Sequence, residues 1–100
     1  MNIINKVSDI TVNDIADYLR IPELITVESN YLATLLAVSK AYVSDYTGLT
    51  AEKIDDHEDI VIAVLVLIED MYDNRAMYVD SDKPNKVVET ILGMHQVNLL

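Results

Sequence analysis

Five consecutive residues carry side chains that could bind a metal ion or exchange a proton. They are Asp55, Asp56, His57, Glu58 and Asp59. Carboxylates and imidazole are ordinary metal ligands, but the spacing fits no ordered ligand set such as His-Glu-x-x-His, and the only other histidine is the distant His95. Acidic residues at a helix start are favoured by the helix dipole. We therefore interpret the run as an acidic, solvated helix start and predict no metal site.

Other catalytic chemistry finds no support in the sequence. The serines stand in no nucleophile-elbow motif, and glycine occurs only at positions 48 and 93, which excludes a glycine-rich phosphate loop. Asp80-Ser81-Asp82 resembles the opening of a calcium loop, but Pro84 takes the fifth position and no glycine takes the sixth. Cysteine is absent, which excludes a thiol nucleophile, a disulfide and a cysteine zinc site. We predict no catalytic residue, no cofactor and no enzymatic activity.

The charge balance limits the kinds of partner. Acidic residues outnumber basic ones by 17 to 7, a formal net charge of −10 over 100 residues. Such a chain is repelled by phosphate backbones and by anionic lipid, so it is not a conventional nucleic-acid binder. The longest apolar run has nine residues, against the roughly 20 that a membrane span needs, and we predict no membrane partner. The absence of cysteine favours an intracellular origin.

The positions of capping residues, glycine and proline divide the first half of the chain into two helices. Thr11, with Asp14 three residues on, predicts a capping box for a short helix that Pro22 ends. Thr26 is the predicted N-cap of a long helix from Val27 to Tyr46, whose apolar residues recur every 3.6 positions. Gly48 is placed to end that helix in the left-handed conformation.

The second half of the chain has a predicted loop and two further helices. The loop covers Leu49–Asp56, and Asp55 with Glu58 predicts a second capping box. A long helix follows from about Glu58 to Tyr78, and a short one runs from Pro84 or Asn85 to about Gly93. The sequence therefore predicts one all-α domain over residues 1–100, with four helices, two of them long.

The nine apolar residues Ile60–Ile68 make the third helix hydrophobic on all sides, so every side of it must be covered. Short neighbouring helices cover only part of such a surface, and either the tail Val97–Leu100 or a second subunit covers the remainder. Core or boundary packing with the hydroxyl at the surface is the more ordinary role of a tyrosine, but tyrosine is also enriched at interfaces, where it can serve as an anchor. The resulting candidate subunit interface consists of Ile62, Leu65, Val66, Tyr42 and Tyr46.

Three short segments in a fixed order resemble a known family. Tyr18-Leu19-Arg20-Ile21 ends the first helix, Asp45-Tyr46-Thr47-Gly48 ends the second, and Met71-Tyr72-Asp73-Asn74-Arg75 lies near the end of the third. Their order and spacing resemble the small head–tail connector proteins of tailed phages, also called adaptor or head completion proteins, over residues 8–94. The sequence departs from the family at Gly93-Met94-His95, where members often have a last helix with a Tyr-Arg-like element.

The resemblance implies a structural protein without catalysis or cofactor. Members form a homo-oligomeric ring beneath the portal protein, lengthen the DNA channel and offer a platform to a tail or stopper protein, so the chain is expected at the head–tail junction of the virion and in the host cytoplasm during assembly. The residues that carry the family motifs are Tyr18, Leu19, Arg20, Tyr46, Gly48, Tyr72, Asn74 and Arg75. An acidic lumen lets DNA pass without holding it, and its candidate residues are Asp55, Asp56, Glu58 and Asp59.

A second function is compatible with the same charge. A small acidic protein can bind a basic partner, such as a nuclease or a DNA-binding protein, by presenting a charge pattern like that of DNA. Neighbouring genes distinguish the two hypotheses, because portal and capsid genes favour a connector, whereas a toxin or nuclease gene favours an inhibitor.

Overall fold

The structure, a computed structural model, describes residues 3–74 and 86–97. In chain order the elements are the 3-10 turn η1 (Val7–Asp9) and the helices α1 (Val12–Leu19), α2 (Thr26–Thr47), α3 (Ala51–Ile54), α4 (Asp59–Asp73) and α5 (Lys86–Met94). No strand occurs among the described residues, so the predicted all-α class is confirmed, with α2 and α4 as its two long helices. Arg75, the predicted continuation of the third helix to Tyr78 and the loop at Asp80–Pro84 lie outside the described residues.

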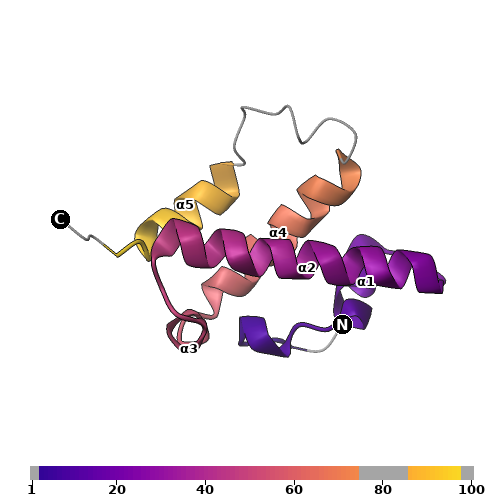
Figure 1. Ribbon diagram of the computed structural model, residues 1–100, viewed down its shortest axis with the longest axis horizontal. Coiled ribbons are helices and arrows are strands. Elements are labelled where there is room, and N and C mark those ends of the chain that lie inside the picture. The colour runs from indigo at the N-terminus through magenta and orange to yellow at the C-terminus, as the bar shows by residue number, and fades with distance from the viewer. Residues whose placement is uncertain (1–2, 75–85, 98–100) are drawn as a thin grey trace.

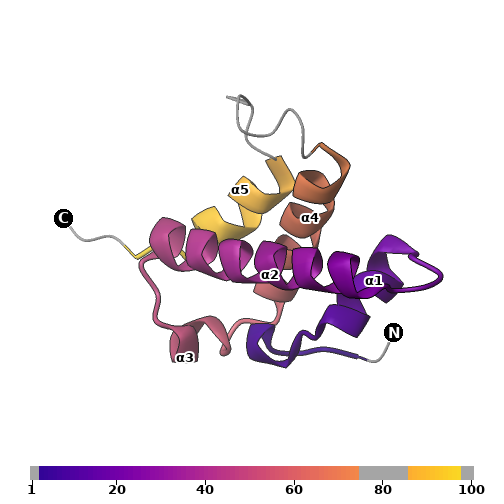
Figure 2. The same ribbon diagram turned by 45° about the vertical axis from the view of Figure 1, so that its right-hand side comes forward.

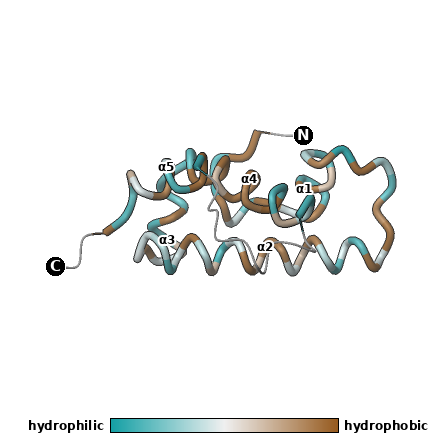
Figure 3. Tube along the Cα trace, turned by 90° about the horizontal axis from the view of Figure 1, so that it is seen from above, coloured by the Kyte–Doolittle hydropathy of each residue, from teal (hydrophilic) through white to brown (hydrophobic). Residues whose placement is uncertain are grey.

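The helices form two layers. Helix α2 crosses the front of the molecule in Figures 1 and 2, and α1, α4 and α5 lie behind it. Seen from above, α2 runs along one edge and those three helices occupy the other (Figure 3). The molecule measures 46 × 32 × 18 Å, and its thinnest dimension is about two helix diameters of roughly 10 Å each. Helix α4 packs most extensively, against both α2 and α5.

The apolar run of α4 is the centre of the core. Most of its side chains are almost completely buried, and they are Ile60, Val61, Ala63, Val64, Leu65, Leu67 and Ile68. They pack with Leu32, Leu35 and Val43 of α2 and with Val88 and Leu92 of α5. Removing that much apolar surface from water is the main force that holds the layers together. Val66 is half-buried, and Ile62 is the most accessible residue of the run, with 54% of it exposed.

Local chemistry sets the ends of α1 and α2. Thr11 accepts a hydrogen bond from the backbone N–H of Asp14, and the Asp14 carboxylate accepts one from the backbone N–H of Thr11, so the predicted capping box is confirmed. Gly48 ends α2 with φ of 77°, as predicted. The predicted N-cap at Thr26 is wrong, because α2 begins at Thr26 itself and its N-cap is Ile25, without a side-chain cap bond.

Two predictions between α2 and α4 are also wrong. The segment expected to be a loop contains α3, because the Thr50 hydroxyl caps a single helical turn by accepting from the backbone N–H of Lys53. The expected capping box of Asp55 and Glu58 does not form. Glu58 is the N-cap of α4 without a side-chain cap bond, and Asp55 instead accepts hydrogen bonds from Ser8, 47 residues away.

Candidate functional site

Helix α4 has a small accessible apolar surface, which we name the α4 patch and define as Ile62 and Val66. The two residues are one turn apart and therefore share a helix face. Ile62 is exposed and Val66 is half-buried. Leu65 was predicted to belong to this interface, but only 5% of it is exposed, because its side chain joins the core instead. The structure thus leaves two of the three α4 residues accessible.

The tyrosine pair, Tyr42 and Tyr46, lies one turn apart on α2. Their rings stack with centroids 5.9 Å apart. Tyr42 is 37% exposed and Tyr46 is half-buried. Burial raises the pKa of Tyr42, with further increases from Tyr46 and from the carboxylate of Glu89 on α5. Each ring packs within the chain and also keeps exposed area. The pair is therefore compatible both with packing inside the chain and with a contact to a second molecule.

The described residues of the family-like motifs lie at or near the C-terminal ends of three helices. Arg20 is the C-cap of α1 in the left-handed conformation, with φ of 62°, and Leu19 is the last residue of that helix. Gly48 is the C-cap of α2. Asn74 is the C-cap of α4, and its side-chain amide donates to the backbone carbonyl and the carboxylate of Asp70.

Two motif tyrosines connect helices. Tyr72 on α4 donates its hydroxyl proton to the carboxylate of Glu28 on α2 and also contacts the ring of Tyr31, with centroids 6.2 Å apart. Burial raises the pKa of Tyr18 on α1, and the nearby carboxylate of Glu69 on α4 raises it further. These contacts give the motif residues an architectural role within the chain.

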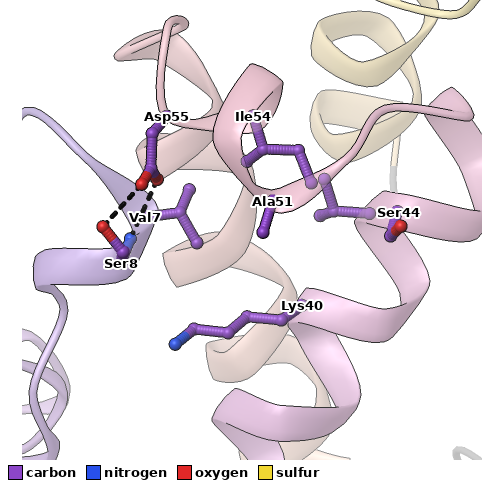
Figure 4. A pocket seen from close by; sticks show the side chains of 8 residues that line it. Val7, Ser8, Lys40, Ser44, Ala51, Ile54 and Asp55 are labelled. Atoms are coloured by element: carbon purple, nitrogen blue, oxygen red, sulfur yellow. Dashed lines mark hydrogen bonds between the residues drawn. The ribbon is translucent and has the colours of Figure 1, made fainter.

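The four acidic residues proposed for a channel surface differ in their surroundings. Asp56 and Glu58 are exposed, whereas Asp55 and Asp59 are half-buried. The backbone N–H and the hydroxyl of Ser8 both donate to Asp55, at 3.1 and 2.6 Å, as Figure 4 shows. The hydrogen bond from the Ser8 hydroxyl is the main reason that the pKa of Asp55 lies below its ordinary value. Asp55 therefore fastens η1 to the end of α3.

A small cavity of about 130 Å³ adjoins this contact (Figure 4). Its lining comes from η1, α2, α3 and the residue that follows α3, and consists of Val7, Ser8, Lys40, Val43, Ser44, Ala51, Ile54 and Asp55. Lys40 is the one cationic side chain there, and Asp55 is occupied by Ser8. The lining contains no histidine and no set of convergent metal ligands. The hydroxyl of Ser8 is bonded to the carboxylate of Asp55, but both oxygens of that carboxylate accept from Ser8, and no third group of the lining orients the pair for nucleophilic catalysis.

A cluster of two histidines and one aspartate brings together residues that the sequence analysis did not connect. His95, just after α5, lies against Asp59, the first residue of α4, with its Nε2 atom 2.9 and 2.8 Å from the two carboxylate oxygens. The ring of His57 packs beside it, with centroids 4.1 Å apart. Only the fold brings these residues together, because Asp59 and His95 are 36 positions apart, and no local motif marks their proximity.

Comparisons of the whole chain with known proteins identify no related protein. Searches against protein-family models, curated proteins and solved structures find no match. None of the described helices is both long enough and apolar enough to cross a membrane. The resemblance to phage head–tail connectors therefore rests on the three motifs and on their order along the chain.

Proposed function

We propose that this protein is a head–tail connector of a tailed phage or prophage, and that copies of it form a ring below the portal protein. Its described motif residues support the proposal most directly. Arg20, Gly48 and Asn74 are the C-caps of three helices, α1, α2 and α4. Each of the three motifs thus contributes the residue that ends a helix. Three matches that share this structural position support the family resemblance more strongly than three matches in loops. The protein would act without catalysis or a cofactor.

The ring would use surfaces that the chain does not cover itself. In a closed ring each subunit presents two different surfaces, so the contact is heterologous. The α4 patch provides an apolar surface on one helix, and the tyrosine pair provides an aromatic surface on another. Ile62 is 54% exposed, so covering it with a neighbour would contribute about half of the roughly 1.5–3 kcal/mol that full burial of an exposed isoleucine gives.

The channel function would depend on charge. DNA carries one negative charge per about 1.7 Å of its axis, so an acidic wall repels it weakly and lets it move. Asp56 and Glu58 are exposed at the turn that precedes α4 and are the best placed of the four acidic candidates. In the virion the ring would contact the portal on one side and a tail or stopper protein on the other.

Negative-stain microscopy of the purified chain, alone and mixed with the portal protein encoded nearest to it, tests the proposal. The expected result is a ring on the portal. Ile62→Lys should prevent the ring while the subunit stays folded, because residue 62 is exposed and Glu58, one turn before it, accommodates the new charge.

The matched control is Val27→Lys. Val27 is 76% exposed on α2 and belongs to neither the α4 patch nor the tyrosine pair, so this variant should still assemble. The absence of any complex with the portal, or of portal and capsid genes near this gene, would contradict the proposed function. Rings that form equally well with Ile62→Lys would show that the α4 patch is not the contact.

The alternative, an inhibitor that imitates DNA charge, is favoured by one observation. None of the acidic side chains in the described residues is fully buried, and no lysine or arginine in that part of the chain forms a salt bridge with them. Their charge is therefore available to a basic partner. Stoichiometric inhibition of a nuclease encoded beside this gene, lost in high salt, would establish this function in place of the connector.

A further inference from the structure

Three segments of the chain meet at the start of α4 and bring metal-ligating side chains together. His57 comes from the turn after α3, Asp59 is the first residue of α4, and His95 follows α5. One ligand atom from each of the three side chains lies within 4.8 Å of the other two. We propose that these residues bind one divalent transition-metal ion, for which Zn²⁺ is the test ion, and that the ion fastens the C-terminal segment to α4.

The hydrogen bond between His95 and Asp59 does not by itself explain the cluster. It satisfies one imidazole, yet a second one is packed against it. The ring nitrogens of His57 make no hydrogen bond to any other described residue, although the side chain is half-buried. Its ring nitrogens are not fully buried, since Oγ of Ser39 is the one buried side-chain nitrogen or oxygen atom without a hydrogen-bond partner among the described residues, so an incoming ion can reach them. A metal ion would coordinate both imidazoles, because each neutral ring donates a lone pair to it.

The donor set favours a transition metal over calcium or magnesium. Two imidazole nitrogens and one carboxylate suit zinc, nickel, copper or cobalt, whereas Ca²⁺ and Mg²⁺ prefer oxygen ligands alone. Three protein ligands leave the fourth tetrahedral position to water. Ligand distances of about 2.0–2.2 Å require donors about 3.4 Å apart, so the three side chains would close by roughly 1–1.5 Å, which rotation about their side-chain bonds can supply.

The surroundings allow an ion to enter and give its binding a structural consequence. The side chain of Asp59 is 40% exposed and that of His95 is 17% exposed, and the exposed carboxylates of Asp56 and Glu58 lie in the same turn. Two residues after His95, the backbone N–H of Val97 donates to the carbonyl of Thr47 at the end of α2. A bound ion would therefore hold together the ends of α2, α4 and α5. This inference replaces the expectation of no metal site, and it does not depend on the proposed function.

The test uses the full chain without a histidine tag, freed of metal by a chelator. Calorimetric titration with ZnCl₂ should show one ion per chain, and thermal unfolding should shift to higher temperature with ZnCl₂ and return when chelator is added. His57→Gln, Asp59→Asn and His95→Gln should each lower the zinc affinity by more than about 100-fold, because losing a residue that only orients a ligand costs about 10- to 100-fold. Co²⁺ bound to the wild type should give visible absorption bands that the histidine variants lack.

His57→Gln is the decisive variant, because it keeps the contact between His95 and Asp59 and should leave the fold intact, as circular dichroism checks. Glu58→Gln is the matched control. It removes a neighbouring exposed carboxylate that is not part of the cluster, and its zinc affinity should be unchanged. The proposal is overturned if the wild type binds no zinc, if His57→Gln binds it as tightly as the wild type, or if Glu58→Gln loses as much affinity as the histidine variants. An equal response to Mg²⁺ would likewise overturn it, because that would indicate diffuse attraction to the acidic surface.

Discussion

Tyr72 on α4 donates a hydrogen bond to Glu28 on α2, with 2.5 Å between the phenol oxygen and Oε1. The two residues are 44 positions apart and join the first turn of one long helix to the last turn of the other. Tyr72 is also a residue of the connector-like motif, and its hydroxyl serves packing within the chain. That role agrees with the position of the motif residues at helix ends.

Removing the hydroxyl of Tyr72 should destabilise the fold without creating a cavity. Tyr72→Phe keeps the ring against Tyr31 and removes the donor to Glu28, which should lower the free energy of unfolding by roughly 1.5–3 kcal/mol, as for a hydrogen bond to a charged group. Urea unfolding measures the change. Tyr46→Phe is the control, because no hydrogen bond of the Tyr46 hydroxyl to a described residue accompanies its ring contact. Equal losses in both variants would contradict the assigned role of the Tyr72–Glu28 bond.

The hydroxyl of Thr11 should contribute more to stability than that of Thr26, although the sequence predicts both residues to be N-caps. Thr11→Ala removes the hydroxyl that accepts from the backbone of Asp14, and the expected loss is about 1 kcal/mol. Thr26→Ala removes an exposed hydroxyl that makes no cap bond and should change stability by less than about 0.5 kcal/mol. Thermal unfolding of the two variants measures the difference. A larger loss at Thr26 would favour the sequence-based assignment over the structure.

These two threonines show what the sequence could and could not predict. The capping box at Thr11 was predicted correctly because both partners lie within four residues, and Gly48 because a glycine after a periodic helix has few other uses. The core of α4 followed from its unbroken apolar run. At Thr26 a capping residue was present, but the helix began at it and not after it. A one-residue difference of this kind is invisible to periodicity.

The remaining misses come from contacts between distant segments. Asp55 is bonded to Ser8 and not to the start of α4, and Leu65 turns into the core because α4 is covered on that side by its own chain. The cluster of His57, Asp59 and His95 needs the end of the chain to return to the start of α4. No pattern within a single helix contains that information, so the proximity of these three side chains could not be predicted before the fold was known.

The two glycines should respond oppositely to alanine. Gly48 has φ of 77°, where a side chain costs about 1–2 kcal/mol, and the added Cβ would lie 3.5 Å from Cβ of Val97, an ordinary contact. Gly48→Ala should therefore destabilise the fold through its backbone alone. Gly93 lies within α5 with nothing within 4 Å of an added Cβ, and Gly93→Ala should stabilise the fold by roughly 0.5–1 kcal/mol. Denaturant unfolding compares the pair, and a shift of the same sign in both would contradict this account.

The stability of the fold should fall at alkaline pH in part because of Tyr42. Its pKa in the folded chain is raised above the ordinary 10.0 by burial, then by Tyr46 and by Glu89. The folded state thus favours the neutral phenol, and the contribution is fully present below pH 10.0 and is lost as the pH rises through the folded pKa. Glu89→Gln removes one cause and should lower the pKa of Tyr42, measured by NMR titration of labelled tyrosine rings. Glu69→Gln is the matched control: it should lower the pKa of Tyr18, which Glu69 raises, and leave Tyr42 unchanged. Equal effects of both variants on Tyr42 would mean that net charge, and not the contact between α2 and α5, sets its pKa.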